Sequence, residues 1–305
     1  YGNNTNTGKA YIYFGGLTMK YDADAVMTGS ASLDYYGRSV SSAGDFNGDG
    51  YSDIIVGADG FSGNTGRAYL YDYYLKNEII PDYVLYAETE YNTFGTSVSS
   101  AGDVNGDGYS DVIVGAYNYD LGQIDVGKAY VYFGSALGIT NSSYWSNGSS
   151  QENAHYGISV STAGDVNGDG YSDVIAGAYG YSSFTGRSYV YFGGTSMNNS
   201  AALAMTGEAS GDSFGYSVSS AGDVNGDGYC DVICGADLNN AGGSSAGRAY
   251  IYFGGSSMNN LVDVTMTGET TNDYFGHSVS LAGDVNSDGY GDVIVGALFN
   301  NGGGS

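Results

Sequence analysis

The chain has 305 residues, 42% of them hydrophobic, and a formal net charge of −25 from 33 acidic and 8 basic side chains. A body this acidic repels phosphate backbones and anionic lipid surfaces, so the composition excludes nucleic acid as a partner. No apolar run approaches 18 residues, and the sequence therefore predicts no direct membrane insertion.

The first predicted element is a strand over residues 9–14, in which small or aliphatic residues alternate with aromatic ones. The pair Tyr36-Gly37 then opens the first of five similar units. The other openings are Phe94-Gly95, Tyr156-Gly157, Phe214-Gly215 and Phe275-Gly276. A unit repeated about every 60 residues indicates one supersecondary motif copied along the chain. We therefore expect residues 1–305 to form a single repeat domain.

Each unit continues with the same order of elements, which is clearest in the fourth. A strand at 217–221 leads into an acidic loop, and an apolar run at 232–236 follows the loop. After a Gly/Ser/Asn-rich connection, two more alternating segments lie at 248–253 and 264–267. Four short strands per unit and no helical period are typical of a β-propeller blade, so the predicted fold class is all-β.

The acidic loop has nine residues and spans 45–53, 103–111, 165–173, 223–231 and 284–292. Side-chain oxygens recur at loop positions 1, 3, 5 and 9, and the glycine at position 6 allows a sharp turn. With the carbonyl of position 7, they can form a shell around one Ca²⁺, whereas Mg²⁺ prefers to keep several waters. The predicted ligands in the first loop are Asp45, Asn47, Asp49, the carbonyl of Tyr51, and Asp53. Those in the other loops are Asp103, Asn105, Asp107, Tyr109 and Asp111; Asp165, Asn167, Asp169, Tyr171 and Asp173; Asp223, Asn225, Asp227, Tyr229 and Asp231; and Asp284, Asn286, Asp288, Tyr290 and Asp292.

Two other interpretations of the loop are weaker. An EF-hand requires a bidentate Glu at position 12. That position holds Val56, Val114, Ala176, Cys234 and Val295. A plain Asp/Asn/Gly turn without an ion fits any single copy, but five copies of clustered carboxylates would repel one another without a cation. We expect about five Ca²⁺ ions, one per repeat, whose binding contributes to folding.

The openings, the Asp-x-Asn-x-Asp-Gly loops and the closing Gly-Ala pairs together resemble FG-GAP repeats, as found in the β-propeller of integrin α subunits and in bacterial and archaeal surface proteins. The closing pairs are Gly57-Ala58, Gly115-Ala116, Gly177-Ala178, Gly235-Ala236 and Gly296-Ala297. The resemblance covers essentially the whole chain. The proline that often follows Gly-Ala in this family is replaced by Asp59, Tyr117, Tyr179, Asp237 or Leu298. We interpret this departure as a matter of loop rigidity.

Propellers of this family usually have seven blades, whereas this chain has five units. The segment before the first opening supplies the last two strands of a blade, and the segment after the last opening supplies the first two. These halves predict a five-bladed ring closed two-plus-two, in which residues 9–14 pair with residues 292–296. Exchange of the same strands between chains would give a polymer. The alternative is that the chain is part of a seven-bladed propeller.

The resemblance implies that the acidic loops lie on one face and the connections that vary in length on the other. These connections are 59–65, 117–126, 179–185 and 237–246, together with 88–93 and 145–154. We predict that the variable face binds a protein or glycan ligand, as in a non-enzymatic adhesion or recognition module. A structural subunit of a cell-surface assembly or fibre is the alternative, and a polysaccharide-acting hydrolase is a weaker one. Trp145, the only tryptophan, is either a ligand anchor or a packed indole.

No catalytic residue is predicted, because His155 and His277 fall at non-equivalent positions of their repeats. Five cations share one repeat position, where pairing with carboxylates is favoured over an anion site. They are Lys9, Arg67, Lys128, Arg187 and Arg248. Cys230 and Cys234 lie too far apart along a strand for a disulfide and are interpreted as strand residues.

The predicted location is extracellular or at the cell surface. Weak Ca²⁺ loops fill where the ion is millimolar. Four Asn-x-Ser/Thr sites, at Asn3, Asn141, Asn147 and Asn198, are possible glycosylation acceptors.

Overall fold

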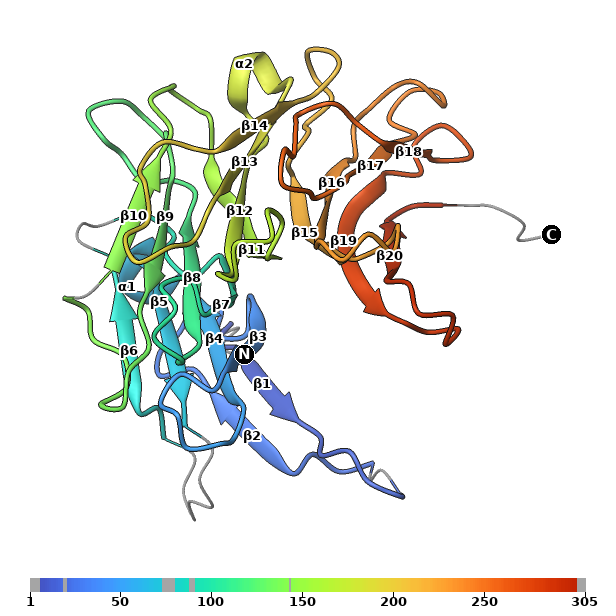
Figure 1. Cartoon of the computed structure of the whole chain (residues 1–305). Helices are drawn as coiled ribbons and strands as arrows, with labels where there is room; N and C mark the ends of the chain where they lie inside the picture. Colours follow the sequence, from blue (N-terminus) through green and yellow to red (C-terminus); the bar gives the residue numbers. More distant parts are fainter. Residues whose placement is uncertain (1–5, 19–20, 73–79, 88–90, 143, 301–305) are drawn as a thin grey trace.

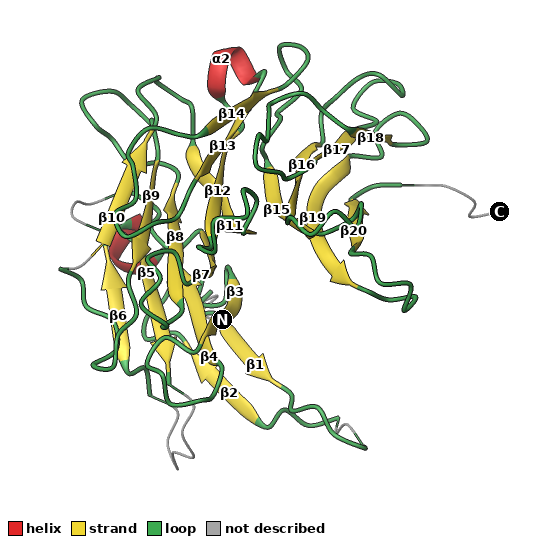
Figure 2. Cartoon of the chain, viewed as in Figure 1, coloured by secondary structure: helices red, strands yellow, loops and turns green. Residues whose placement is uncertain are grey.

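In the computed structural model the chain forms an arc of antiparallel sheets, described for residues 6–18, 21–72, 80–87, 91–142 and 144–300. Four sheets have four strands, and the two sheets at the ends of the arc have two (Figure 1). Each four-stranded sheet contains consecutive strands of the chain in simple order, as the repeat predicted. The predicted all-β propeller architecture is confirmed, and loops join nearly all of its strands (Figure 2).

The sheets follow one another along the chain. The first contains β1 (Lys9–Ile12) and β2 (Ala25–Thr28); the second β3 (Val40–Gly44), β4 (Asp53–Ala58), β5 (Arg67–Tyr71) and β6 (Tyr83–Tyr86). The third contains β7 (Ser97–Gly102), β8 (Asp111–Ala116), β9 (Lys128–Tyr132) and β10 (Tyr144–Gly148); the fourth β11 (Tyr156–Gly164), β12 (Asp173–Ala178), β13 (Arg187–Tyr191) and β14 (Leu203–Thr206). The fifth contains β15 (Ser217–Gly222), β16 (Asp231–Ala236), β17 (Arg248–Tyr252) and β18 (Val264–Thr267); the last β19 (Phe275–Gly283) and β20 (Asp292–Ala297).

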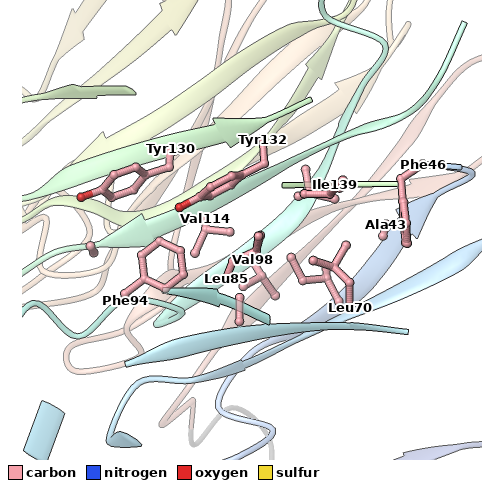
Figure 3. Packing of buried hydrophobic residues seen from close by; sticks show 14 of the residues in the cluster. Ala43, Phe46, Leu70, Leu85, Phe94, Val98, Val114, Tyr130, Tyr132 and Ile139 are labelled. Carbon is pink, nitrogen blue, oxygen red and sulfur yellow. The ribbon is translucent and has the colours of Figure 1, made fainter. Parts of the chain in front are cut away.

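In the four-stranded sheets, the second strand is the most deeply buried element. Strands β8, β12 and β16 are buried at every residue. Each has a strand on both sides, so its apolar side chains face the neighbouring sheets on both surfaces. The core therefore lies between adjacent sheets. Figure 3 shows Leu70 and Leu85 of the second sheet in one cluster with Val98 and Val114 of the third.

Two four-residue helical turns interrupt the connections between second and third strands. They are α1 (Phe61–Asn64) and α2 (Tyr181–Phe184), drawn red in Figure 2. The sequence analysis predicted no helix, and these single turns contain positive φ angles that break the helical period. Among the described residues, no helix has the length and hydropathy needed to cross a bilayer.

The predicted ring closure is not made in this structure. Among the described residues, β1 pairs only with β2 and β20 only with β19, and the two short sheets lie at opposite ends of the arc (Figure 1). The physical consequence is visible in β20, where Ile294 is 61% exposed while its counterparts Ile113 and Ile233 are fully buried. The five repeats are confirmed, and closure is not.

The topology gives the arc two faces. Each acidic loop joins the first and second strands of a sheet, whereas the next connection leaves from the other end of the second strand. The variable connections at 59–65, 117–126, 179–185 and 237–246 therefore lie on the face opposite the loops, as expected. The expected connection at 145–154 is wrong at its start, because residues up to Gly148 belong to β10. Residues 88–90 of another expected connection lie outside the described residues.

Candidate cation loops and the opposite face

Each acidic loop is wound around the aspartate at its first position. In the second loop, the N–H groups of Gly106 and Asp107 donate to Oδ1 of Asp103 at 2.7 and 3.1 Å, and the N–H of Gly108 donates to Oδ2 at 2.8 Å. Oδ1 of Asn105 accepts the N–H of Asp107 at 2.9 Å. The loops that begin at Asp45, Asp165 and Asp223 make the same bonds.

The aspartate at position 9 is buried at the foot of the loop. Asp111 is fully buried, with Oδ2 accepting the N–H of Val104 at 2.9 Å and Oδ1 accepting the N–H of Gly134 at 2.8 Å. The pKa of Asp111 is raised to about 7: burial has the largest effect, the two N–H groups lower the pKa, and the nearby carboxylates of Asp107 and Asp103 raise it. Asp173 has the same contacts and a pKa likewise raised to about 7.

The donor set fits a hard cation in part. All side-chain donors are oxygens, and the carboxylates at positions 1 and 5 lie near enough to raise the pKa of the carboxyl at position 9, an effect that a divalent cation would oppose. However, no three acidic, histidine or cysteine side chains among the described residues form a ready metal-binding group. The structure thus brings the predicted ligands into one loop while their oxygens bond to backbone N–H groups.

Neighbouring loops contact each other, which the sequence did not predict. The ring of Tyr171, at position 7 of the third loop, packs against Gly106, at position 4 of the second; a Cβ at Gly106 would lie 2.5 Å from the ring. The contact recurs between Tyr109 and Gly48, Tyr229 and Gly168, and Tyr290 and Gly226. In addition, the N–H of Ser172 donates to the carbonyl of Asp103 at 3.0 Å. Every described loop is therefore joined to the next.

The last loop differs at one of these positions. Ser287 stands where the other loops have glycine, with a φ of 62°. Ser287 is exposed, so the side chain at position 4 of this loop lies at the surface.

On the opposite face, aromatic side chains from four repeats form a continuous row. Tyr117 and His155 lie 5.7 Å apart between ring centroids, His155 stacks on Tyr179 at 5.0 Å and 11°, Tyr216 contacts Tyr179 at 5.6 Å, and His277 contacts Tyr216 at 5.0 Å. We call the surface formed by these five side chains the aromatic face. Burial lowers the pKa of His155 and raises that of Tyr179 to about 12.

A histidine–aspartate hydrogen bond and an arginine–aspartate ion pair lie along this row. Nδ1 of His277 and Oδ2 of Asp237 are 2.9 Å apart, and Nε of Arg38 lies 3.6 Å from Oδ2 of Asp59. Burial raises the pKa of both aspartates, against the lowering effects of their partners. The aromatic face therefore has charged groups set into its edges.

The backbone positions these side chains in the same way in every repeat. The residue before each opening pair has a positive φ between 50° and 58°; these residues are Tyr35, Thr93, His155, Ser213 and Tyr274. The N–H of each donates to a carbonyl of the preceding connection, as His155 does to Asp125 at 3.0 Å. The backbone at this position is therefore nearly the same in every repeat, while the side chain that it carries differs.

The sequence analysis missed the aromatic face, although one signal was present. Tyr117, Tyr179 and Asp237 occupy the position after Gly-Ala, and the interpretation of that departure as loop rigidity overlooked their place on this surface. His155 and His277 were considered only as bases. Their non-equivalent positions, one before and one after an opening pair, nevertheless bring both into the same row.

The cations at the shared repeat position mostly contact aromatic rings. The guanidinium of Arg67 lies 3.6 Å from the Phe61 ring, that of Arg187 lies 3.9 Å from Tyr181, and Nζ of Lys128 lies 4.6 Å from Tyr130. Arg248 pairs with Glu208 at 2.8 Å, as predicted for the whole set. The expectation of carboxylate partners thus holds for Arg248, whereas Arg67 and Arg187 contact aromatic rings instead.

Two further sequence questions are answered. Trp145 is 7% exposed and packs edge-on against Tyr191 at 4.9 Å, so it is a packed indole. Cys230 and Cys234 are free thiols.

Comparison with known proteins agrees with this architecture. A model of the FG-GAP repeat matches residues 36–71, 94–132, 156–191, 214–252 and 275–305. Integrin alpha-5 of Xenopus laevis is 32% identical over 193 residues, covering 59% of this chain and 18% of that protein. Integrin alpha-V of Gallus gallus is 30% identical over 236 residues, covering 71% of this chain and 22% of that protein.

A third relative is named as a phospholipase and not as an integrin. Phosphatidylinositol-glycan-specific phospholipase D of Bos taurus is 31% identical over 186 residues, covering 56% of this chain and 22% of that protein. The matches span less than a quarter of the length of these relatives. With five matched repeats and the sheets that they form, the chain belongs to the FG-GAP repeat family, with an integrin-like propeller architecture.

Proposed function

We propose that this chain is an extracellular, calcium-binding, non-enzymatic recognition module, in which the acidic loops stabilise the propeller and the aromatic face binds a protein or glycan. The proposal rests on a difference between the two faces. The acidic loops make the same contacts in successive repeats, whereas the opposite face presents different side chains on a nearly constant backbone. Membership of a family that includes integrin α subunits supports the recognition role.

Calcium is proposed at all five loops. Binding would require the position-1 carboxylate to exchange some backbone N–H bonds for the ion, together with the oxygens at positions 3, 5, 7 and 9. The positive charge of the ion would offset the repulsion among carboxylates such as those of Asp103, Asp107 and Asp111. At a tenfold excess over Kd, each ion contributes about 1.4 kcal/mol to folding.

The calcium proposal is tested by calorimetry on the chelated protein. We expect about five Ca²⁺ per chain and a sharply lower melting temperature in chelator. Asp107→Ala should remove one ion from the count, whereas Glu152→Gln, which changes an exposed acid outside the loops, should leave the count unchanged. An identical melt with and without the ion would refute the proposal.

Recognition is tested with protein and glycan arrays probed by the calcium-loaded chain. Binding should weaken when Tyr179 or Tyr216 of the aromatic face is replaced by Ala and should persist in Glu152→Gln. Turnover of a polysaccharide or phospholipid, abolished by one Asp or Glu change outside the loops, would instead favour an enzyme.

The extracellular setting is supported by the expected need for millimolar Ca²⁺ and by the integrin α relatives. Two glycosylation sites are engaged in the fold: the side-chain amide of Asn141 donates to the carbonyl of Val84 at 2.9 Å, and that of Asn147 donates to Asn199. The Asn198 side chain is exposed, and its Oδ1 accepts the N–H of Ser200 at 2.9 Å, which leaves its amide nitrogen at the surface. Asn3 lies outside the described residues. Peptide mass mapping of native material should therefore find any glycan at Asn198 before the other two.

The free edges of β1 and β20 favour a second candidate, self-assembly or closure through terminal strands. β20 has the sequence of β8, and β1 resembles β9. In the β8–β9 pair, Ile113 faces Val131. The same register would set Ile294 opposite Ile12.

That register is tested by cysteine pairs in a Cys230→Ser background. Ile12→Cys with Ile294→Cys should form a disulfide, whereas the out-of-register pair Ala10→Cys with Ile294→Cys should not. A cross-linked monomer indicates closure and a cross-linked ladder indicates assembly. If neither pair cross-links, the two edges do not meet.

A further inference from the structure

The row of aromatic contacts stops at the first repeat, where the surface is hollowed instead. A cavity of about 270 Å³ lies between the first two repeats. Its walls include Tyr35 and Tyr117, Asn64 and Asn118, and the Arg38–Asp59 pair. We call this cavity the first-repeat pocket. It is smaller than the roughly 300–1,000 Å³ of sites for drug-sized ligands, so its size suits a single small ring.

The polar groups of the pocket are available for a ligand. Among the described residues, no hydrogen bond is made by the side-chain amides of Asn64 and Asn118, each of which offers two donors and one acceptor. Arg38 uses Nε toward Asp59 and is 61% exposed, which leaves its terminal N–H groups facing solvent. The carboxamides of Asn64 and Asn118 and the guanidinium of Arg38 are planar, and each can bind two adjacent hydroxyls of a ligand.

The apolar walls are held in place before a ligand arrives. The ring of Tyr35 lies against Gly60, where a Cβ would clash with it, and its backbone N–H donates to the carbonyl of Asn6 at 3.2 Å. Tyr35 is still 43% exposed. The ring of Tyr117 packs against that of His155, with 5.7 Å between the ring centroids. Two ordered rings beside free carboxamides lower the entropy cost of binding.

The charges in and around the pocket favour an uncharged ligand over an anion or a cation. Arg38 and Asp59 offset each other, so the pocket has little net charge, while the whole chain carries −25 and repels anions. The exposed guanidinium also disfavours a cationic side chain. What remains is an uncharged ring with apolar C–H faces for the tyrosines and several hydroxyls for the amides and the guanidinium.

We propose that the first-repeat pocket binds one neutral saccharide ring, such as the terminal unit of a glycan. This inference rests on the recognition role proposed above and names its ligand class. The C–H face of the sugar packs on Tyr35 or Tyr117, and its hydroxyls bond to Asn64, Asn118 and Arg38.

The test uses the calcium-loaded 305-residue chain and the methyl glycosides of glucose, galactose, mannose, N-acetylglucosamine and N-acetylgalactosamine, with glucuronate and sialic acid as acidic comparators. Saturation-transfer NMR and calorimetry should detect at least one neutral glycoside with a Kd of about 10 mM or tighter. Asn64→Ala and Asn118→Ala should each weaken it about tenfold. Asn153→Ala is a matched control, since Asn153 and Asn64 are both exposed and both have positive φ.

The melting temperature of each variant shows that it is folded. The proposal is overturned if no neutral glycoside binds, if only the acidic comparators bind, or if the two pocket variants bind as well as Asn153→Ala. It is also overturned if a protein captured on the array needs Asn64 and Asn118 while no saccharide does. That last result would leave the recognition role intact, and none of these results alters the calcium test.

Discussion

The acidic-loop face and the aromatic face are built from the same repeats, but the contacts made by their side chains differ. On the loop face, Asp103, Asp165 and Asp223 accept the same backbone N–H groups at nearly the same distances. On the opposite side of the arc, equivalent positions hold Tyr35 in one repeat and His155, a member of the aromatic face, in another, with φ angles of 50° and 53°. One face is constrained by bonds that every repeat must make, and the other only by backbone shape. Side chains are therefore free to differ where their contacts are not needed for folding.

The largest effect is expected at the buried end of a loop. Asp111→Ala removes the acceptor for the N–H groups of Val104 and Gly134, each worth roughly 1–3 kcal/mol when left unpaired in the interior. In chelator, urea unfolding should show a loss of about 2 kcal/mol or more. Asp107→Ala, at an exposed position of the same loop, should cost less than about 1 kcal/mol. Equal losses would mean that burial does not distinguish the two positions.

The contact between loops comes next. Gly106→Ala adds a methyl group 2.5 Å from the Tyr171 ring at a φ of 75°, whereas Gly108→Ala adds one in open space at a φ of 89°. Both changes incur the backbone strain of a left-handed residue, so their difference isolates the contact. We expect Gly106→Ala to be less stable by about 1–3 kcal/mol in chemical denaturation. Matching losses would show that the tyrosine moves aside freely.

On the aromatic face, acid should weaken the fold through His155. Burial lowers its folded-state pKa below the ordinary 6.5, so the unfolded chain binds the proton more readily. The contribution of neutral His155 to stability is complete above pH 6.5 and is lost as the pH falls through the folded-state pKa. Melting temperatures from pH 8 to 4 should therefore fall less steeply in His155→Gln than in the parent chain. Parallel profiles would contradict the burial effect.

The smallest effect is expected at the cations that begin the third strands and contact aromatic rings. Arg187→Ala loses the contact with Tyr181 and should cost about 0.5–1 kcal/mol. Lys9→Ala changes the same repeat position, where no ring or carboxylate contact is described, and should be nearly neutral. Thermal unfolding of both variants in high salt decides between them, and an effect as large for Lys9 would contradict the cation–π explanation.

The sequence was sufficient for the fold and for the loops because both depend on local repetition. Four strands per unit are visible in a single repeat, and the spacing of the acidic side chains is visible in a single loop, such as 223–231. The row from Tyr117 to His277 was not predictable in this way, since it joins residues whose positions in their own repeats differ. The closure of the ring was also not predictable, because pairing β1 with β20 depends on the curvature summed over all sheets, which no single repeat encodes.

The tyrosine that packs on the glycine of the preceding loop has a consequence for how such chains can change in length. One nine-residue segment contains both halves of the contact, a ring that reaches backward and a glycine that receives the next ring. A duplicated unit therefore fits its neighbours on both sides without any compensating substitution. Ser287 is the exception, since this loop has a side chain at the position where the other four have the receiving glycine.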